Sequence, residues 1–124
     1  MSKPTYVDDY ALIATTLKKY TEGLVAASGS DMRPAFAKEA TVFSVENGIL
    51  SGGPAEGLFA NIDEDFEASL EARVAITRVE IVGSAASARI DINDVNGFYF
   101  SDFIHLLKVE GAWTIVGKIF YTHA

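Results

Sequence analysis

Residues 85–122 read AASARIDINDV NG FYFSDFIHLLKV EG AWTIVGKIFYT, and this stretch decides the fold. It holds three runs rich in β-branched and aromatic residues, separated by Asn96–Gly97 and Glu110–Gly111. Such dipeptides between apolar runs are typical of tight hairpin turns. A fourth run precedes the stretch and ends at Gly83–Ser84. We therefore expect a meander of four antiparallel strands: Arg73–Val82, Ala85–Val95, Phe98–Val109 and Ala112–Thr122.

A long helix is expected at the start of the chain. Between Thr5 and Ala27, apolar residues recur at steps of three or four, which is the pattern of a helix with one buried face. They are Tyr6, Tyr10, Ile13, Leu17, Tyr20 and Leu24.

Two shorter helices and one more hairpin are expected between this helix and the meander. The sequence predicts a second helix over Met32–Lys38 and a third over Pro54–Ile62, with a further turn near Asp65–Leu70. Between the two shorter helices, Ala40–Glu46 is rich in strand formers, and Asn47–Gly48 suits a hairpin turn. The third helix would then cover one end of the sheet.

The order of these elements defines the fold class. Helices first and strands last indicate an α+β fold. Strands and helices do not alternate as βαβ units, so we do not expect a doubly wound nucleotide-binding sheet. We expect N-terminal helices packed on a curved antiparallel sheet that forms a cone around an internal pocket. A length of 124 residues fits a single domain over residues 1–124.

Charge and composition exclude several classes of protein. The net charge of -7 opposes binding to phosphate backbones, so no nucleic-acid partner is expected. The absence of cysteine rules out disulfides, thiolate metal sites and thiol nucleophiles, and suits a cytoplasmic location. Residues 1–10 contain no apolar leader segment, and no apolar run reaches the length of a bilayer span, so no membrane partner is expected.

Sequence motifs for metal or cofactor binding are absent. The chain has two histidines, His105 and His123, which are poor material for a zinc site. It has no phosphate-binding glycine loop, paired-histidine motif or nucleophile elbow. We expect neither a metal nor a cofactor.

The turns also predict which strand residues face each other. A two-residue Asn-Gly loop pairs Val95 with Phe98 and, counted outward, Asp91 with Asp102. At the last hairpin we expect a three-residue loop, because a two-residue loop would force a positive φ on glutamate. Lys118 then faces Asp102.

This register gives the sheet two different faces. One face carries a charged row, which consists of Arg78, Glu80, Arg89, Asp91, Asp102 and Lys118. The other face is more apolar and is expected to meet the helices. It carries Val79, Thr77, Ala88, Ile90, Ile92, Tyr99, Ser101, Phe103, His105, Leu107, Trp113, Ile115, Ile119 and Tyr121.

The charged face also bears large apolar residues, which predict that a second copy of the chain covers it. We expect a homodimer through this outer face, with the interface residues Arg78, Arg89, Asp91, Asp102 and Lys118. An alternative is that the like charges of Asp91 and Asp102 form a catalytic pair.

Several segments resemble the nuclear-transport-factor-2-like superfamily. They are the tyrosine-bearing first helix, Phe36–Val42, and the final hairpin segment Lys108–Ile115. The segment Ser101–Lys108, followed by Trp113 and Lys118, is similar to the lumazine-binding or SnoaL-like bacterial branch. The superfamily includes ketosteroid isomerases, polyketide cyclases and dehydratases, and the resemblance implies a cystatin-like cone with a pocket.

The resemblance to ketosteroid isomerases implies roles for three positions. The oxyanion-hole tyrosine corresponds to Tyr20 and the oxyanion-hole aspartate to His105. The proton-shuttling base corresponds to Ser44, whose hydroxyl cannot abstract a carbon-bound proton unaided. The usual isomerase base is therefore missing.

We expect the pocket to bind a small, mostly apolar or aromatic molecule. Its expected contacts are Tyr20, Ser44, Tyr99, Ser101, Phe103, His105 and Tyr121. Two alternatives remain open. One is a cofactor-free isomerase, dehydratase or cyclase with His105 as acid or base and Tyr20 as hydrogen-bond donor. The other is a non-catalytic dimerisation or accessory module whose cavity is filled by its own aromatic residues.

Overall fold

A computed structural model of the chain describes residues 6–123 as three α-helices, one 3-10 helix and six strands. The helices are α1 (Tyr6–Val25), α2 (Gly29–Met32), the 3-10 helix η1 (Arg33–Ala35) and α3 (Glu56–Asp65). The strands are β1 (Phe36–Glu46), β2 (Ile49–Pro54), β3 (Arg73–Val82), β4 (Ala85–Val95), β5 (Phe98–Val109) and β6 (Ala112–His123). The predicted helix start at Thr5 lies outside the described residues.

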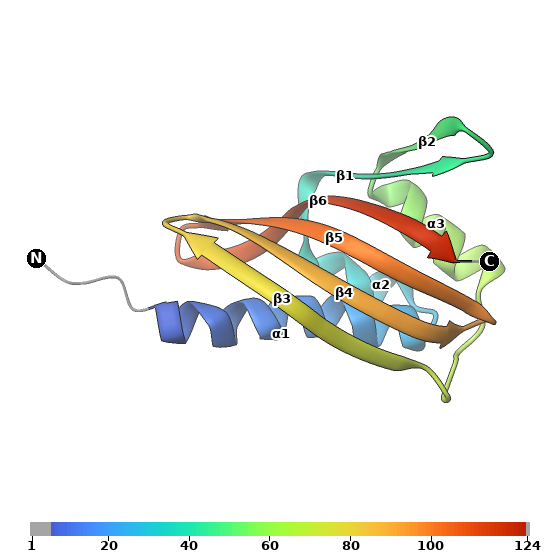
Figure 1. The fold of residues 1–124 in the computed structure, drawn as a ribbon, viewed down its shortest axis with the longest axis horizontal. Helices are drawn as coiled ribbons and strands as arrows, with labels where there is room; N and C mark the ends of the chain where they lie inside the picture. The colour runs from blue at the N-terminus through green and yellow to red at the C-terminus, as the bar shows by residue number, and fades with distance from the viewer. Residues whose placement is uncertain (1–5, 124) are drawn as a thin grey trace, which may run out of the picture.

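The six strands form one curved, open sheet in the order β2-β1-β6-β5-β4-β3. Neighbouring strands are antiparallel, except that β1 runs parallel to β6. Figure 1 shows α1 and α2 on one side of this sheet, and α3 near the β1–β2 hairpin. The α+β class is confirmed, with a mixed sheet in place of a wholly antiparallel one. No helix within residues 6–123 is long and apolar enough to cross a membrane.

The segment between α1 and β2 differs from the prediction. The helix predicted over Met32–Lys38 is wrong, because a short α2 ends at Met32 and the chain is already extended at Phe36. Phe36 is a buried core residue, so tertiary packing outweighs the local helix preference. Pro54 does not open α3 but ends β2, where it pairs with Thr41, and no helix forms over residues 66–72.

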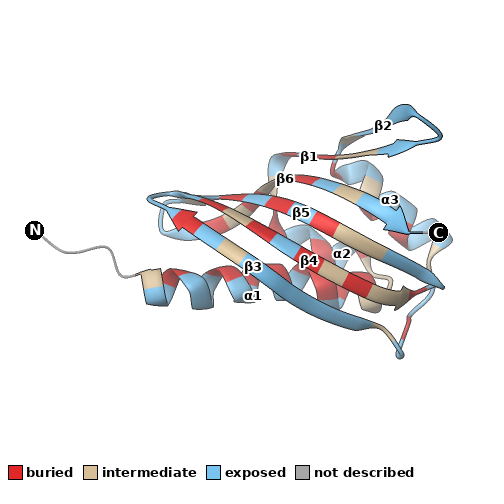
Figure 2. Cartoon of the chain, in the orientation of Figure 1, coloured by how far each residue is buried: buried red, intermediate tan, exposed pale blue. Residues whose placement is uncertain are grey.

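The core lies between α1 and the inner face of the sheet. Ile13, Leu17, Tyr20 and Leu24 are buried along α1, as the spacing predicts, whereas Tyr10 is exposed. In the middle of the sheet, buried and exposed residues alternate along each strand, as the colours in Figure 2 show for β4 and β5. The buried residues of the strands form one apolar cluster with those of α1 and α3.

A β-bulge in β4 determines which face each β5 residue takes. The predicted pair Val95–Phe98 is confirmed, but Ile92 pairs with Phe100, whereas counting outward from the turn would pair it with Ser101. The extra residue in β4 lies next to Asp94, whose φ is 62°. One extra residue shifts the register by one and moves every later side chain to the other face.

A second bulge, in β6, follows an unexpected turn. The last hairpin closes with a two-residue loop in which Glu110 adopts a φ of 50°, so the predicted three-residue loop is wrong. Leu106 then pairs with Ile115, but His105 pairs with Gly117. The extra residue is Val116, and beyond it the β6 side chains again change face.

These two bulges reverse part of the predicted face assignment. The residues that turn outward instead of inward are Tyr99, Ser101, Phe103, His105, Leu107, Ile119 and Tyr121. Asp102 and Lys118 turn inward, and they pair with Phe120 and Ile104 instead of with each other. The predicted pair of Asp91 and Asp102 is also wrong, because Asp91 pairs with Ser101.

Candidate functional site

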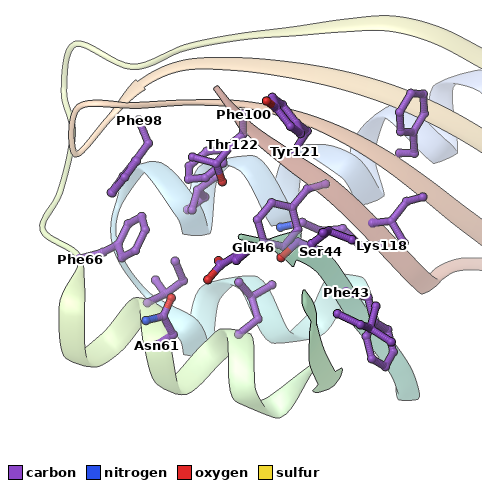
Figure 3. A pocket seen from close by; sticks show the side chains of 18 of the residues that line it. Phe43, Ser44, Glu46, Asn61, Phe66, Phe98, Phe100, Lys118, Tyr121 and Thr122 are labelled. Atoms are coloured by element: carbon purple, nitrogen blue, oxygen red, sulfur yellow. The ribbon is translucent and has the colours of Figure 1, made fainter. Parts of the chain in front are cut away.

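A cavity of about 1220 Å³ lies at one end of the sheet. Its lining comes from α1, α3, the β1–β2 hairpin and the neighbouring parts of β5 and β6. Figure 3 shows Ser44 and Lys118 together on one side of this space and Phe66 and Phe98 on the other. The cavity is therefore built from segments far apart in the sequence.

Tyr20, Asp102 and Lys118 form a hydrogen-bonded chain at the inner side of the cavity. The Nζ of Lys118 donates to the Tyr20 hydroxyl over 2.6 Å, and this hydroxyl donates to Oδ2 of Asp102 over 2.5 Å. The Nζ of Lys118 lies 3.9 Å from the same Oδ2. Tyr20 and Lys118 line the cavity, and the carboxyl of Asp102 lies behind the tyrosine as its hydrogen-bond acceptor.

Burial changes the proton affinity of all three groups. It raises the pKa of Asp102, although the Lys118 charge and the hydrogen bond from Tyr20 act in the opposite direction. It lowers the pKa of Lys118, against the attraction of Asp102. Burial, and then the Asp102 charge, raise the pKa of Tyr20, so that its hydroxyl stays protonated. Burial thus acts against the charged forms of Asp102 and Lys118, whereas their mutual attraction acts in favour of them.

Two aromatic rings also contact the amino group of Lys118. Its Nζ lies 4.7 Å from the ring centre of Tyr20 and 4.8 Å from that of Phe120. Ring faces attract an ammonium by roughly 0.5–2 kcal/mol. Removing a buried charge from water costs several kcal/mol, so the pKa of Lys118 remains lowered.

The second carboxyl oxygen of Asp102 is an unusual buried group. Oδ1 is buried and has no hydrogen-bond partner among the described residues. An unpartnered oxygen costs less on a neutral carboxyl than on a carboxylate. This observation agrees with the raised pKa of Asp102.

Phenylalanines form the opposite wall of the cavity. Phe66 stacks on Phe98 with ring centres 6.2 Å apart, and Phe98 lies 5.7 Å from Phe100. Phe100 meets Phe120 edge-on at 6.0 Å. These four residues form an aromatic wall that runs from the end of α3 to Lys118. The apolar surface of the wall therefore ends at the amino group of Lys118.

The structure brings together only some of the predicted site residues. Tyr20, Ser44, Phe103 and Tyr121 line the cavity, although Phe103 and Tyr121 belong to the outer face and reach only its rim. His105 is exposed on the outer face, so the prediction that it faces the pocket with Tyr20 is wrong.

Tyr99 and Ser101 also lie on the outer face and do not line the cavity, which corrects a second part of the predicted site. The hydroxyl of Ser101 hydrogen-bonds Oδ1 of Asp91 and Nε2 of His123, both at 2.9 Å. The physical reason is the bulge in β4, which rotates this part of β5 by one residue.

Asp102 and Lys118 are the functional residues that sequence reasoning placed wrongly. They were predicted on the outer face, as interface residues beside Arg78, Arg89 and Asp91, but they are 1% and 6% exposed inside the protein. Polar and apolar residues alternate along β4 from Ser87 to Asn93, and a second polar residue in succession, Asp94, breaks this alternation, which could have indicated a bulge. Among the described residues, no three acidic or histidine side chains cluster as a metal site would require.

The chain belongs to the "Putative lumazine-binding" family, whose sequence profile matches residues 8–121. Similar solved structures confirm the nuclear-transport-factor-2-like fold that the sequence resemblance implied.

Three proteins are similar to this chain over almost its whole length. A nuclear-transport-factor-2-like protein of unknown function from Shewanella baltica OS155 is 53% identical, with a TM-score of 0.96 over 98% of this chain and 99% of that chain. A second such protein, from Methylobacillus flagellatus KT, is 35% identical, with a TM-score of 0.92 over 100% of this chain and 99% of that chain. Aldolase FrzH from Cladobotryum sp is 23% identical over 124 residues, which cover 99% of this chain and 98% of that protein.

Proposed function

We propose that the cavity binds a small, mostly aromatic molecule and holds an oxygen atom of this ligand against Lys118. The observation that carries the proposal is a single buried amino group at the end of an aromatic wall. Pockets for small molecules typically combine apolar walls with a few placed polar groups. The family description, which refers to lumazine, is consistent with a planar, oxygen-bearing ligand.

The hydrogen bonds of Lys118 and Tyr20 support this orientation. An ammonium has three donors and a neutral amine two, and one donor of Lys118 is used by Tyr20. At least one donor thus remains for a ligand oxygen. The hydroxyl of Tyr20 already donates to Asp102, so its role is to position Lys118 and polarise its donors.

A thermal-shift titration with lumazine and with benzyl alcohol tests the proposal. We expect both ligands to raise the unfolding temperature of the wild type, because they bind the folded state. Phe100→Ala shortens the aromatic wall and should weaken binding, whereas His105→Ala on the outer face should leave it unchanged. A shift that disappears in His105→Ala but survives in Phe100→Ala would contradict the proposed site. No shift with any small aromatic ligand would favour an accessory module without a ligand.

A cofactor-free enzyme acting next to a carbonyl group is the second candidate. It is favoured by the chain from Lys118 through Tyr20 to Asp102, which joins a donor for the carbonyl oxygen to a group that can take up a proton. The similarity to a protein named as an aldolase supports the same class of reaction. His105 has no part in this version, since it lies on the other face of the sheet.

Hydrogen–deuterium exchange at carbon tests this second candidate. An enzyme that stabilises an enolate exchanges the α-hydrogens of aromatic ketones such as acetophenone in heavy water. We expect exchange to be lost in Lys118→Met and kept in His105→Ala. Exchange at the uncatalysed rate in the wild type would argue against turnover while leaving ligand binding intact.

We further propose a homodimer through the outer face of the sheet. Five large side chains on this face are more than two-fifths exposed: Tyr99, Phe103, Leu107, Ile119 and Tyr121. Contiguous apolar surface of this kind usually marks an interface. The charged residues Arg78, Arg89 and Asp91 remain on this face, where they can set the register of two copies.

A further inference from the structure

We infer that Lys118 forms a covalent imine with the carbonyl carbon of an aldehyde or ketone bound in the cavity. This inference rests on the proposed ligand site and names both the chemical class of its substrate and the atom that reacts. The class is an aromatic carbonyl compound, and the reacting atom is Nζ of Lys118.

Three features of the site suit an amine nucleophile. Lys118 contacts the cavity although the whole residue is only 6% exposed, so a ligand can reach Nζ while bulk water is largely excluded. Burial lowers the pKa of Lys118, and an amine attacks a carbonyl only in its neutral form. The aromatic wall ends at Nζ, which places the substituent of an aryl ring next to the amine.

The hydrogen-bonded chain supplies a route for the protons of this reaction. The ammonium of Lys118 passes a proton to the Tyr20 hydroxyl, which passes its own proton to Asp102. This transfer leaves a neutral amine and a neutral carboxylic acid. The unpartnered Oδ1 of Asp102 is consistent with such an acid.

The covalent step balances without any oxidant or cofactor. The Nζ lone pair forms a bond to the carbonyl carbon, and the carbonyl oxygen takes up a proton from nitrogen to give a carbinolamine. The proton held by Asp102 returns through Tyr20 to this hydroxyl, which leaves as water. The products are a protonated imine on Lys118, one water molecule and the Asp102 carboxylate.

A protonated imine attracts electrons from the bonds next to it. It therefore makes the adjacent carbon–hydrogen or carbon–carbon bond easier to break than the original carbonyl does. The reaction class that follows is proton exchange, or carbon–carbon bond making and breaking, beside a former carbonyl group.

Reductive trapping with benzaldehyde and sodium cyanoborohydride tests the inference on the full chain at neutral pH. We expect intact-mass and peptide-mapping measurements to find one benzyl group on Lys118. The control site is Lys18, whose side chain is 71% exposed. Because the cavity would hold the aldehyde next to Nζ of Lys118, this lysine should be labelled at least about ten times faster than Lys18.

Two variants and one competing ligand test whether the fast labelling occurs at Lys118 and within the cavity. Lys118→Arg keeps a cation but cannot form an imine, and should lose the fast labelling, whereas Lys18→Arg should keep it. Benzyl alcohol, which has no carbonyl, should slow labelling at Lys118 and leave labelling at Lys18 unchanged. If Lys118→Arg fails to fold, the peptide map of the wild type still decides the question.

The failure of this inference differs from the failure of the proposed function. Equal labelling rates at Lys118 and Lys18, together with a thermal shift by benzyl alcohol, would overturn the imine and leave the binding site standing. Equal rates without any thermal shift would overturn both.

Discussion

Tyr20 joins the first helix to the polar end of the cavity. It is fully buried, and its hydroxyl accepts a hydrogen bond from Lys118 while it donates one to Asp102. Lys118 and Asp102 are themselves buried. If the Tyr20 hydroxyl were removed, neither could form a replacement hydrogen bond with bulk water. This makes the hydroxyl important for stability as well as for the site.

Removing this hydroxyl should destabilise the protein. We expect Tyr20→Phe to lower the free energy of unfolding by about 1–3 kcal/mol, because two buried polar groups lose a partner. Urea unfolding followed by circular dichroism measures the change. The matched control is Tyr121→Phe on the exposed outer face, which should change stability by less than about 0.5 kcal/mol. Equal effects of the two substitutions would contradict a structural role for the hydrogen bonds among Lys118, Tyr20 and Asp102.

Asp9 is a second buried acid, and it ties α1 to the last hairpin. Its Oδ1 accepts hydrogen bonds from Nζ of Lys108 at 2.9 Å and from Nε1 of Trp113 at 3.0 Å. The bond from Lys108, followed by that from Trp113, lowers the pKa of Asp9 below its usual 3.8.

The sign of this shift predicts a pH dependence. A depressed pKa in the folded state means that the stabilisation is complete above the unfolded value and is lost as pH falls through the folded value. The stability difference between the wild type and Asp9→Asn should therefore shrink between about pH 5 and pH 2. Urea unfolding at a series of pH values measures it. The control is Asp8→Asn, at the exposed neighbouring residue.

At the scale of elements, the bulge in β4 selects the residues that face the cavity. Asp94 adopts a φ of 62° next to the extra residue, a conformation that is costly for β-branched side chains. We expect Asp94→Val to destabilise the protein by about 1–2 kcal/mol, since the strain falls on the backbone. Asp94→Gly should be close to neutral by the same unfolding measurement, because glycine adopts this conformation freely. Similar losses for Val and Gly would show that the Asp94 side chain matters more than its backbone.

The packing of α1 on α2 depends on a glycine. A Cβ built on Gly23 would lie 2.7 Å from the backbone nitrogen of Met32, whereas one on Gly57 in α3 would meet nothing within 4 Å. We expect Gly23→Ala to be destabilising, because the two backbones must separate. Gly57→Ala should be neutral or stabilising by up to about 1 kcal/mol, because alanine favours the helix. Differential scanning calorimetry of both variants checks this contrast, and a stabilising Gly23→Ala would contradict the close packing.

At the scale of the whole molecule, the outer face should hold two copies together. We expect sedimentation or light scattering at micromolar concentration to give twice the 13.4 kDa mass of one chain. Leu107→Lys introduces charge into this apolar surface and should yield monomers. Leu70→Lys, at a residue that is 94% exposed away from this surface, should remain dimeric. A monomeric wild type would disprove the interface.

Much of the fold could be predicted from local signals. The β3, β4 and β5 strands have the predicted bounds, and the turns at Asn47–Gly48 and Asn96–Gly97 form as expected. Tyr20 was correctly placed on the buried stripe of α1 and at the cavity. The partners of Tyr20 could not be predicted, because counting outward from a turn assumes that no residue is inserted on the way.

The sequence by itself determined the α+β class, the order of the elements and most of the turns, because these depend on apolar periodicity and on residues that tolerate a positive φ. Only the tertiary structure decided that Asp102 and Lys118 face Tyr20 while His105 faces outward. The physical reason is that one extra residue in β4 and one in β6 each exchange the two faces of the sheet. A local pattern such as Asn93–Asp94 can point to a bulge, but the register that results depends on how the curved sheet packs on α1.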